Sequence, residues 1–106
     1  MTKAKIDRNL TFLEIGGKKL SPGTYKVAKG TIVRYHAHCH NEDNDGGLIY
    51  LLVRDLISGK DIYSDWSNAY SLDADGSFVV ESDMEILVFA GHWDGSKWVC
   101  DDVTDP

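Results

Sequence analysis

The sequence has few cysteines and no segment suited to crossing a membrane. Its two cysteines, Cys39 and Cys100, lie far apart and form no C-x-x-C pair, which argues against a zinc finger or a disulfide scaffold. They would form a disulfide in an oxidising compartment. No apolar stretch follows the first residues, so we expect no signal peptide, a cytoplasmic or virion location, and two buried free thiols. No apolar run approaches about 18 residues, so we expect no membrane partner.

Positive charge is also scarce. Lysine and arginine number 11 against 17 aspartates and glutamates, a formal net charge of −6. This balance argues against nucleic acid or an anionic membrane surface as a partner, because both require a basic patch. The 106 residues suffice for one domain with one core, and we expect residues 1–9 to form an extended N-terminal arm.

Helical periodicity is missing, and short strand patterns replace it. Glycine-, proline- and aspartate-rich turns recur about every 8–12 residues, a spacing that predicts an all-β, single-domain antiparallel β-sandwich, jelly-roll-like in arrangement. The segment 48–53 is apolar on both faces, which predicts a central strand covered on both sides, or covered once and shielded by a loop. The expected strands are 10–15, 24–28, 31–40, 48–53, 62–66, 77–81 and 85–90, followed by a hairpin at 93–98.

The hairpin has two alternative turns. A Gly-Ser turn of type II′ would place Trp93 opposite Trp98 as a cross-strand pair, whereas an Asp-Gly turn of type I′ would separate them.

The segment 34–40 carries three of the four histidines at alternate positions. Alternate side chains of a strand share one face, so the polar set should lie opposite an apolar core set. Cys39 then points away from the histidines, which argues against a Cys–His catalytic pair. We interpret the polar face first as a recognition or contact surface and second as a metal site. The polar set is Arg34, His36, His38 and His40, and the core set is Val33, Tyr35, Ala37 and Cys39.

Strand geometry limits the metal interpretation to one histidine pair. His36 and His40 lie about 13 Å apart along a regular strand, so one ion would use His36 and His38. Candidates for the third ligand are His92, Glu42 and the aspartates. The spacing Gly30-x5-His36-x-His38-x3-Glu42 resembles the first motif of the cupin family. That resemblance implies iron, manganese or zinc, and makes a small cupin-like metalloenzyme the alternative function.

A second candidate ion site follows the histidines. Asn41, Asp43 and Asp45 alternate and Gly46 follows them, as in the first half of a calcium loop. The twelfth position is Leu52 rather than the glutamate of an EF-hand. A structural calcium and a solvated acidic turn therefore both remain open.

Aromatic residues stand among small polar ones between residues 63 and 71. Tyr63, Trp66 and Tyr70 in this setting suit sugar stacking, a protein interface, or packing at the edge of a sandwich.

Two segments carry a second resemblance. Ser21-Pro22-Gly23-Thr24-Tyr25-Lys26-Val27 and Gly95-Ser96-Lys97-Trp98-Val99-Cys100-Asp101-Asp102-Val103, with the order of strands between them, resemble jelly-roll carbohydrate-binding modules of the galactose-binding-like type over about residues 20 to 104. The resemblance implies a non-catalytic sandwich, often with a structural calcium. It makes Trp66 or Tyr63 the stacking candidates, and Arg34, His36 and His38 the polar contacts.

The expected function is therefore a non-enzymatic binding or structural module. Its partner would be a carbohydrate or a protein surface, and by analogy of fold it would be a decoration or attachment protein of a phage or viral particle, in contact with a capsid or a host glycan. A sheet face rich in tyrosine, tryptophan, histidine and arginine has the composition of an interface, so we also expect a homo-oligomer.

Overall fold

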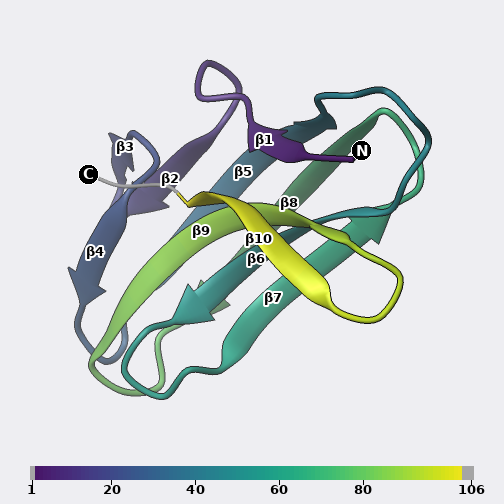
Figure 1. Ribbon diagram of the computed structural model, residues 1–106. Helices are drawn as coiled ribbons and strands as arrows, with labels where there is room; N and C mark the ends of the chain where they lie inside the picture. The colour runs from purple at the N-terminus through teal and green to yellow at the C-terminus, as the bar shows by residue number, and fades with distance from the viewer. Residues whose placement is uncertain (1, 104–106) are drawn as a thin grey trace.

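Two antiparallel sheets face each other in the computed structural model, which describes residues 2–103 (Figure 1). The predicted single-domain β-sandwich is confirmed. One sheet contains β1 (Ala4–Ile6), β2 (Phe12–Ile15), β3 (Lys18–Leu20), β5 (Ile32–Asn41) and β8 (Ser71–Val79). The other contains β4 (Thr24–Val27), β6 (Ile49–Asp55), β7 (Asp61–Ser67), β9 (Met84–Trp93) and β10 (Trp98–Val103). No helix in the described part of the chain is long and apolar enough to cross a membrane.

Each sheet is organised around one ten-residue strand. In the first sheet, β8 pairs with one side of β5, while β1 and β2 share its other side and β3 extends from β2. In the second sheet, β6 and then β7 lie on one side of β9, while β4 and β10 share its other side. The chain passes from sheet to sheet after β3, β4, β5, β7 and β8, a jelly-roll-like alternation.

The core lies between the sheets, where the odd-numbered residues of β5 are buried as predicted. Ile49, Leu51 and Val53 of β6 meet them from the second sheet. The even-numbered residues Tyr50 and Leu52 point outward and are buried in a smaller cluster with Phe89. The apolar residues of this strand are therefore buried on both faces, on the outward face by side chains of the same sheet.

Part of the predicted N-terminal arm is a strand of the sheet. Ala4 and Ile6 are buried and pair with β5, because their alternation with an exposed lysine matches the pleat; three residues are too few for this pattern to stand out in the sequence. Their outward N–H groups donate to the carboxylates of Asp101, at 2.9 Å, and Asp102, at 2.8 Å. A register shift in β10 between residues 100 and 102 places both carboxylates at this edge, which is thereby capped. Met1 of the predicted arm lies outside the described residues.

Both cysteines are free thiols, as expected, but only one is buried. Cys39 belongs to the core, and burial raises the pKa of its thiol to about 12. The expectation of a buried Cys100 is wrong, because this residue pairs with Gly91 at the sheet edge and is exposed.

The C-terminal hairpin adopts the register of the Gly-Ser alternative. Trp93 lies opposite Trp98, and their ring centroids are 5.1 Å apart in an edge-to-face contact. Gly95 has a φ of +107°, a conformation that its lack of a side chain permits.

Candidate functional site

The sandwich separates the predicted recognition residues onto two opposite surfaces. The polar residues of β5 lie on the outward face of the first sheet, where His36 pairs with Asp75 of β8. Trp66 lies on the outward face of the second sheet, because it pairs with the outward Tyr50. Since the core lies between these faces, one ligand cannot be stacked by Trp66 and held by the histidines. The predicted combined site therefore divides into two, with Arg34, His36, His38 and His40 in one part and Trp66 in the other.

On the outward face of β5, which we call the histidine face, His36 and His38 each contact a different neighbouring strand rather than each other. His38 Nδ1 lies 2.6 Å from Oδ1 of Asp73 on the neighbouring strand β8. His36 instead stacks on Phe12 of β2, with ring centroids 5.6 Å apart and an angle of 27°. The two histidines are thus directed toward partners on opposite sides of β5.

The structure does not assemble the predicted metal ligands into a cluster. Within residues 2–103, no group of three or more His, Cys, Asp or Glu side chains is arranged to hold a metal ion. Glu42 follows the end of β5, where its N–H donates to the carbonyl of Lys3, while one nitrogen of His38 is engaged by Asp73. The cupin-like site remains a hypothesis without a geometric counterpart among these residues.

The candidate calcium loop is held by hydrogen bonds between its own residues and by one from Thr2. Asn41 is buried, and its Oδ1 accepts the N–H groups of Asp43 and Asn44, each at 3.1 Å. Asp45 Oδ1 accepts Nδ2 of Asn41 at 3.0 Å and also the hydroxyl of Thr2. These bonds lower the pKa of the Asp45 carboxyl well below its usual range, and the bond from Asn41 contributes most. The observed contacts are those of an acidic turn, and calcium stays a prediction.

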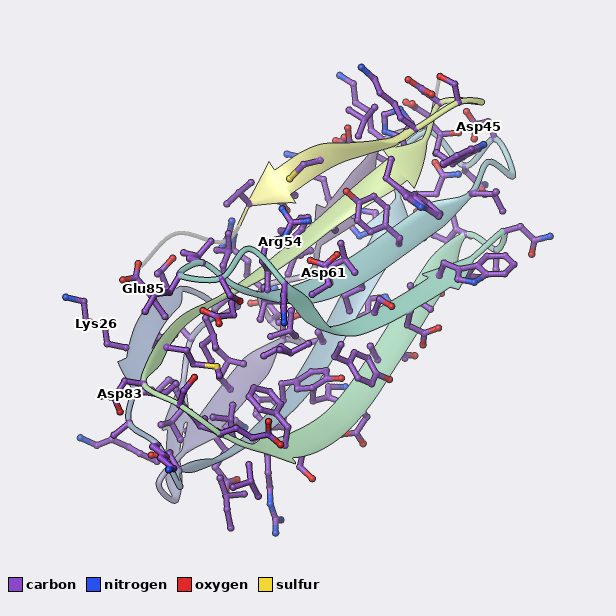
Figure 2. All side chains as sticks on the ribbon, turned by 90° about the horizontal axis from the view of Figure 1, so that it is seen from below. Lys26, Asp45, Arg54, Asp61, Asp83 and Glu85 are labelled. Atoms are coloured by element: carbon purple, nitrogen blue, oxygen red, sulfur yellow. The ribbon has the colours of Figure 1, made fainter. Side chains whose placement is uncertain are left out.

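A cavity of about 200 Å³ lies on the outward face of the second sheet. The exposed indoles of Trp66 on β7 and Trp98 on β10 belong to its wall, with 61% and 43% of their surfaces accessible. The lining residues are Tyr50, Leu52, Asp61, Ser64, Asp65, Trp66 and Trp98. The acidic loop with Asp45 lies at another end of the molecule, well away from Asp61 (Figure 2).

The aromatic part of the cavity depends on a glycine. A Cβ at Gly91 would lie 2.4 Å from Cε1 of Tyr50 and 2.1 Å from the carbonyl oxygen of Val99, so only glycine lets the Tyr50 ring lie across the strand. Tyr50 then contacts Trp98, with ring centroids 4.5 Å apart, and Trp93 supports Trp98 from the other side of the hairpin. Burial raises the pKa of the Tyr50 phenol to about 12, so it remains a neutral hydroxyl that can donate a hydrogen bond.

The polar part of the cavity comes from β7. Asp61 Oδ1 accepts a hydrogen bond from Nε of Arg54 at 2.7 Å, and Figure 2 shows the two side chains directed toward each other. Arg54 also stacks over the ring of Phe89, at 4.6 Å from its centroid. Ser64 of β7 lies opposite the outward Leu52 and adds a hydroxyl to the lining. Asp65 pairs with the core residue Leu51, so its carboxylate lies on the inner side of β7, where Oδ1 accepts the backbone N–H of Trp66 at 2.9 Å. Arg54 is therefore engaged on both sides and does not itself line the cavity.

Of the three predicted aromatic residues, only Trp66 lines the cavity. Tyr63 points into the core, where its ring contacts Tyr35 at a centroid distance of 4.9 Å. Tyr70 lies beside His40, with ring centroids 6.2 Å apart, on the side of the first sheet. Tyr63 and Tyr70 are thus separated from Trp66 by strand alternation and by the β7–β8 connection, respectively.

Sequence reasoning missed several residues of the cavity, namely Tyr50, Asp61, Ser64 and Trp98. One signal was present: one of the two turns considered for the last hairpin, the Gly-Ser turn, pairs Trp93 with Trp98, as the structure shows. Comparisons with family models, curated proteins and solved structures found no match for this chain.

Proposed function

We propose that the protein is a non-enzymatic binding module that holds a glycan in the cavity of the second sheet. The observation that carries this proposal is the pair of exposed indoles, Trp66 and Trp98, beside hydroxyl and carboxylate groups. Indole rings stack on the apolar C–H faces of sugars, while the serine and aspartate oxygens accept hydrogen bonds from sugar hydroxyls. The volume, about 200 Å³, is smaller than the roughly 300–1,000 Å³ of pockets for drug-sized ligands and suits a single sugar ring.

The positions of the two carboxylates on β7 support binding rather than hydrolysis. Glycosidases generally need one carboxyl group as a proton donor and a second as a nucleophile or base. Asp61 accepts from Arg54, and Asp65 accepts from the backbone of Trp66. Because Asp65 pairs with the core residue Leu51, its carboxylate lies on the other side of β7 from the cavity, so the cavity does not hold two facing carboxyl groups.

A role as a decoration or attachment protein of a phage or viral particle, expected from the sequence, is compatible with glycan binding on the second sheet. A glycan on the second sheet leaves the histidine face, including His40 and Tyr70, available for contact with a capsid or another copy of the chain. The alternative, a cupin-like enzyme, requires one equivalent of iron, manganese or zinc that is lost in His36→Ala. Elemental analysis of untagged protein separates the two functions.

The proposal is tested by glycan-array screening, followed by calorimetric titration of the best sugar. We expect Trp66→Ala and Trp98→Ala to reduce the affinity at least ~10-fold, because loss of a stacking ring removes more than about 1.4 kcal/mol. Tyr70→Ala is the matched control, since Tyr70 is 53% exposed but lies on the opposite side of the sandwich. Unchanged binding by both tryptophan variants, or a loss confined to Tyr70→Ala, would contradict the proposed site.

A further inference from the structure

Among the described strands, β8 has the longest unpaired edge. Its nine residues pair with β5 on one side, and within residues 2–103 no strand pairs with its other side, which we call the β8 edge. We infer that the β8 edge receives an extended segment of a partner protein with lysine or arginine at alternate positions, which joins the first sheet as a further strand. This segment would lie on the sheet that does not carry the glycan cavity.

The hydrogen bonds at the two ends of β8 show which backbone groups point out of the sheet. Asn41 N–H donates to the Tyr70 carbonyl, and Val80 N–H donates to the Thr31 carbonyl. In an antiparallel ladder, successive residues direct their N–H and C=O groups to opposite sides of the strand, so the even-numbered residues of this segment bond to β5. The groups that point away from β5 belong to Ser71, Asp73, Asp75, Ser77 and Val79, and no hydrogen bond to them is found in the described chain.

The other sheet edges carry features that protect an edge from new partners. β3 and β4 have only three and four residues, β1 is capped by Asp101 and Asp102, and β10 contains a register shift. The pairing of β7 with β6 is also interrupted, and the Trp66 N–H is taken by Asp65. Short length, irregular pairing and capped groups limit strand addition, as do proline and lysine. β8 has none of these five features.

The charge of β8 disfavours a second copy of the chain as the added strand. Asp75 stands at the middle of the nine residues, and its side chain is exposed. Two copies joined along their full β8 edges about a two-fold axis would place this carboxylate directly opposite the same carboxylate of the second copy, with Asp73 on the diagonal. Like charges directly opposite each other destabilise a strand pair, whereas a cation at this position stabilises it.

A cationic residue of an added strand would find an available carboxylate. No hydrogen bond or ion pair to Asp75 is found within residues 2–103. Asp73 Oδ1 is engaged by His38, but 67% of the Asp73 side chain remains exposed. The basic residues of the histidine face lie on β5, on the other side of β8 from its free edge, so they do not occupy the place of an added strand. The net charge of −6 also attracts a cationic partner.

The test uses a nine-residue peptide of alternating lysine and valine with blocked ends. One comparison peptide has glutamate in place of lysine. The other keeps the lysines but carries N-methyl groups on their backbone nitrogens, which preserves the charge and removes the N–H donors that would face β8. In calorimetric titration at neutral pH and low salt, we expect the lysine–valine peptide to bind at least ~10-fold more tightly than either comparison peptide.

Amide hydrogen exchange followed by NMR locates the binding. The lysine–valine peptide should slow the exchange of the Asp73, Asp75 and Ser77 amides, which have no partner in the free protein. Equal affinity of the N-methylated peptide, or unchanged exchange of these amides, overturns the inference, because charge alone would then attract the peptide.

A charge reversal tests the role of Asp75. Asp75→Lys should shift the preference to the glutamate–valine peptide. Glu42→Lys is the control, since it makes the same change of charge at an exposed residue that follows β5, and it should keep the preference for lysine. A lysine preference that survives in folded Asp75→Lys overturns the inference. So does a dimer in analytical ultracentrifugation whose Asp73, Asp75 and Ser77 amides already exchange slowly, because a second copy would then occupy the edge.

Discussion

Gly76 makes room for the largest fully buried side chain of the core. It lies on β8 directly opposite Tyr35 of β5, and a Cβ at this position would be 2.8 Å from the Tyr35 hydroxyl oxygen and 3.1 Å from Cζ. Its backbone φ lies outside the left-handed region, so alanine is strained by this contact alone. Overpacking of a well-packed core costs about 1–3 kcal/mol. We therefore expect Gly76→Ala to lower the free energy of unfolding by about 2 kcal/mol.

The substitution of the facing residue, Tyr35→Phe, should raise the free energy of unfolding or leave it unchanged. The Tyr35 hydroxyl is buried and receives no hydrogen bond of regular geometry within residues 2–103. Burial, followed by the neighbouring Tyr63, raises the pKa of this phenol far above its ordinary value. A buried polar group without a partner costs about 1–3 kcal/mol, so its removal should leave the free energy of unfolding unchanged or raise it by about 1 kcal/mol.

The two substitutions should be coupled. In Tyr35→Phe the nearest atom to a Cβ at Gly76 is Cζ at 3.1 Å rather than the oxygen at 2.8 Å, so the cost of Gly76→Ala should fall by about 1 kcal/mol or more. Urea unfolding of the four proteins, followed by tryptophan fluorescence, measures this coupling. Ser77→Ala, one residue further along β8 on its outward face, is the control and should change stability by less than about 0.5 kcal/mol. If Gly76→Ala costs the same with and without the hydroxyl, the contact does not explain the glycine.

Three further predictions use the same structure. Gly91→Ala should destabilise the protein by at least ~2 kcal/mol, measured by urea unfolding, because its Cβ would meet Tyr50 and a backbone carbonyl; a neutral effect would contradict the observed packing. Cys100 should react with a thiol reagent in the native protein while Cys39 reacts only on unfolding, as mass spectrometry of the labelled protein would show. The lowered pKa of Asp45 stabilises the folded state above the unfolded value near ~3.9, and this stability is lost as the pH falls below it. Acid titration should therefore show a smaller stability loss below about pH 4 in Asp45→Asn, and identical profiles would contradict the assignment.

The sequence predicted the sandwich because its strongest strands alternate clearly or are apolar throughout. In β5, Val33 and Tyr35 are buried and the polar residues between them face outward, so one pattern gave the strand, its core face and the direction of Cys39. The β1 strand was not predicted, because Ala4 and Ile6 are only two apolar residues and their burial depends on β5 and on Asp101, which is 97 residues away from Ala4. Contacts at such separation leave no local trace in the sequence.

The candidate site was only partly predictable because neither face of β7 is clearly apolar or clearly polar. Tyr63 and Asp65 alternate with Ser64 and Trp66, so each face of the strand carries one aromatic and one polar residue. Pairing with β6 decides between them: Tyr63 lies opposite the core residue Val53, whereas Trp66 lies opposite the outward Tyr50.

A slip of one residue between β6 and β7 would reverse this choice. It would place Tyr63 on the outward face and Trp66 on the inner face, opposite a core residue of β6 such as Leu51. The observed pairing with β6 thus places Trp66 in the cavity wall. For a strand of this kind, a binding residue can be assigned only after the neighbouring strand is known, because the outward orientation of Trp66 follows from its pairing with Tyr50 of β6 and not from the pattern of β7 itself.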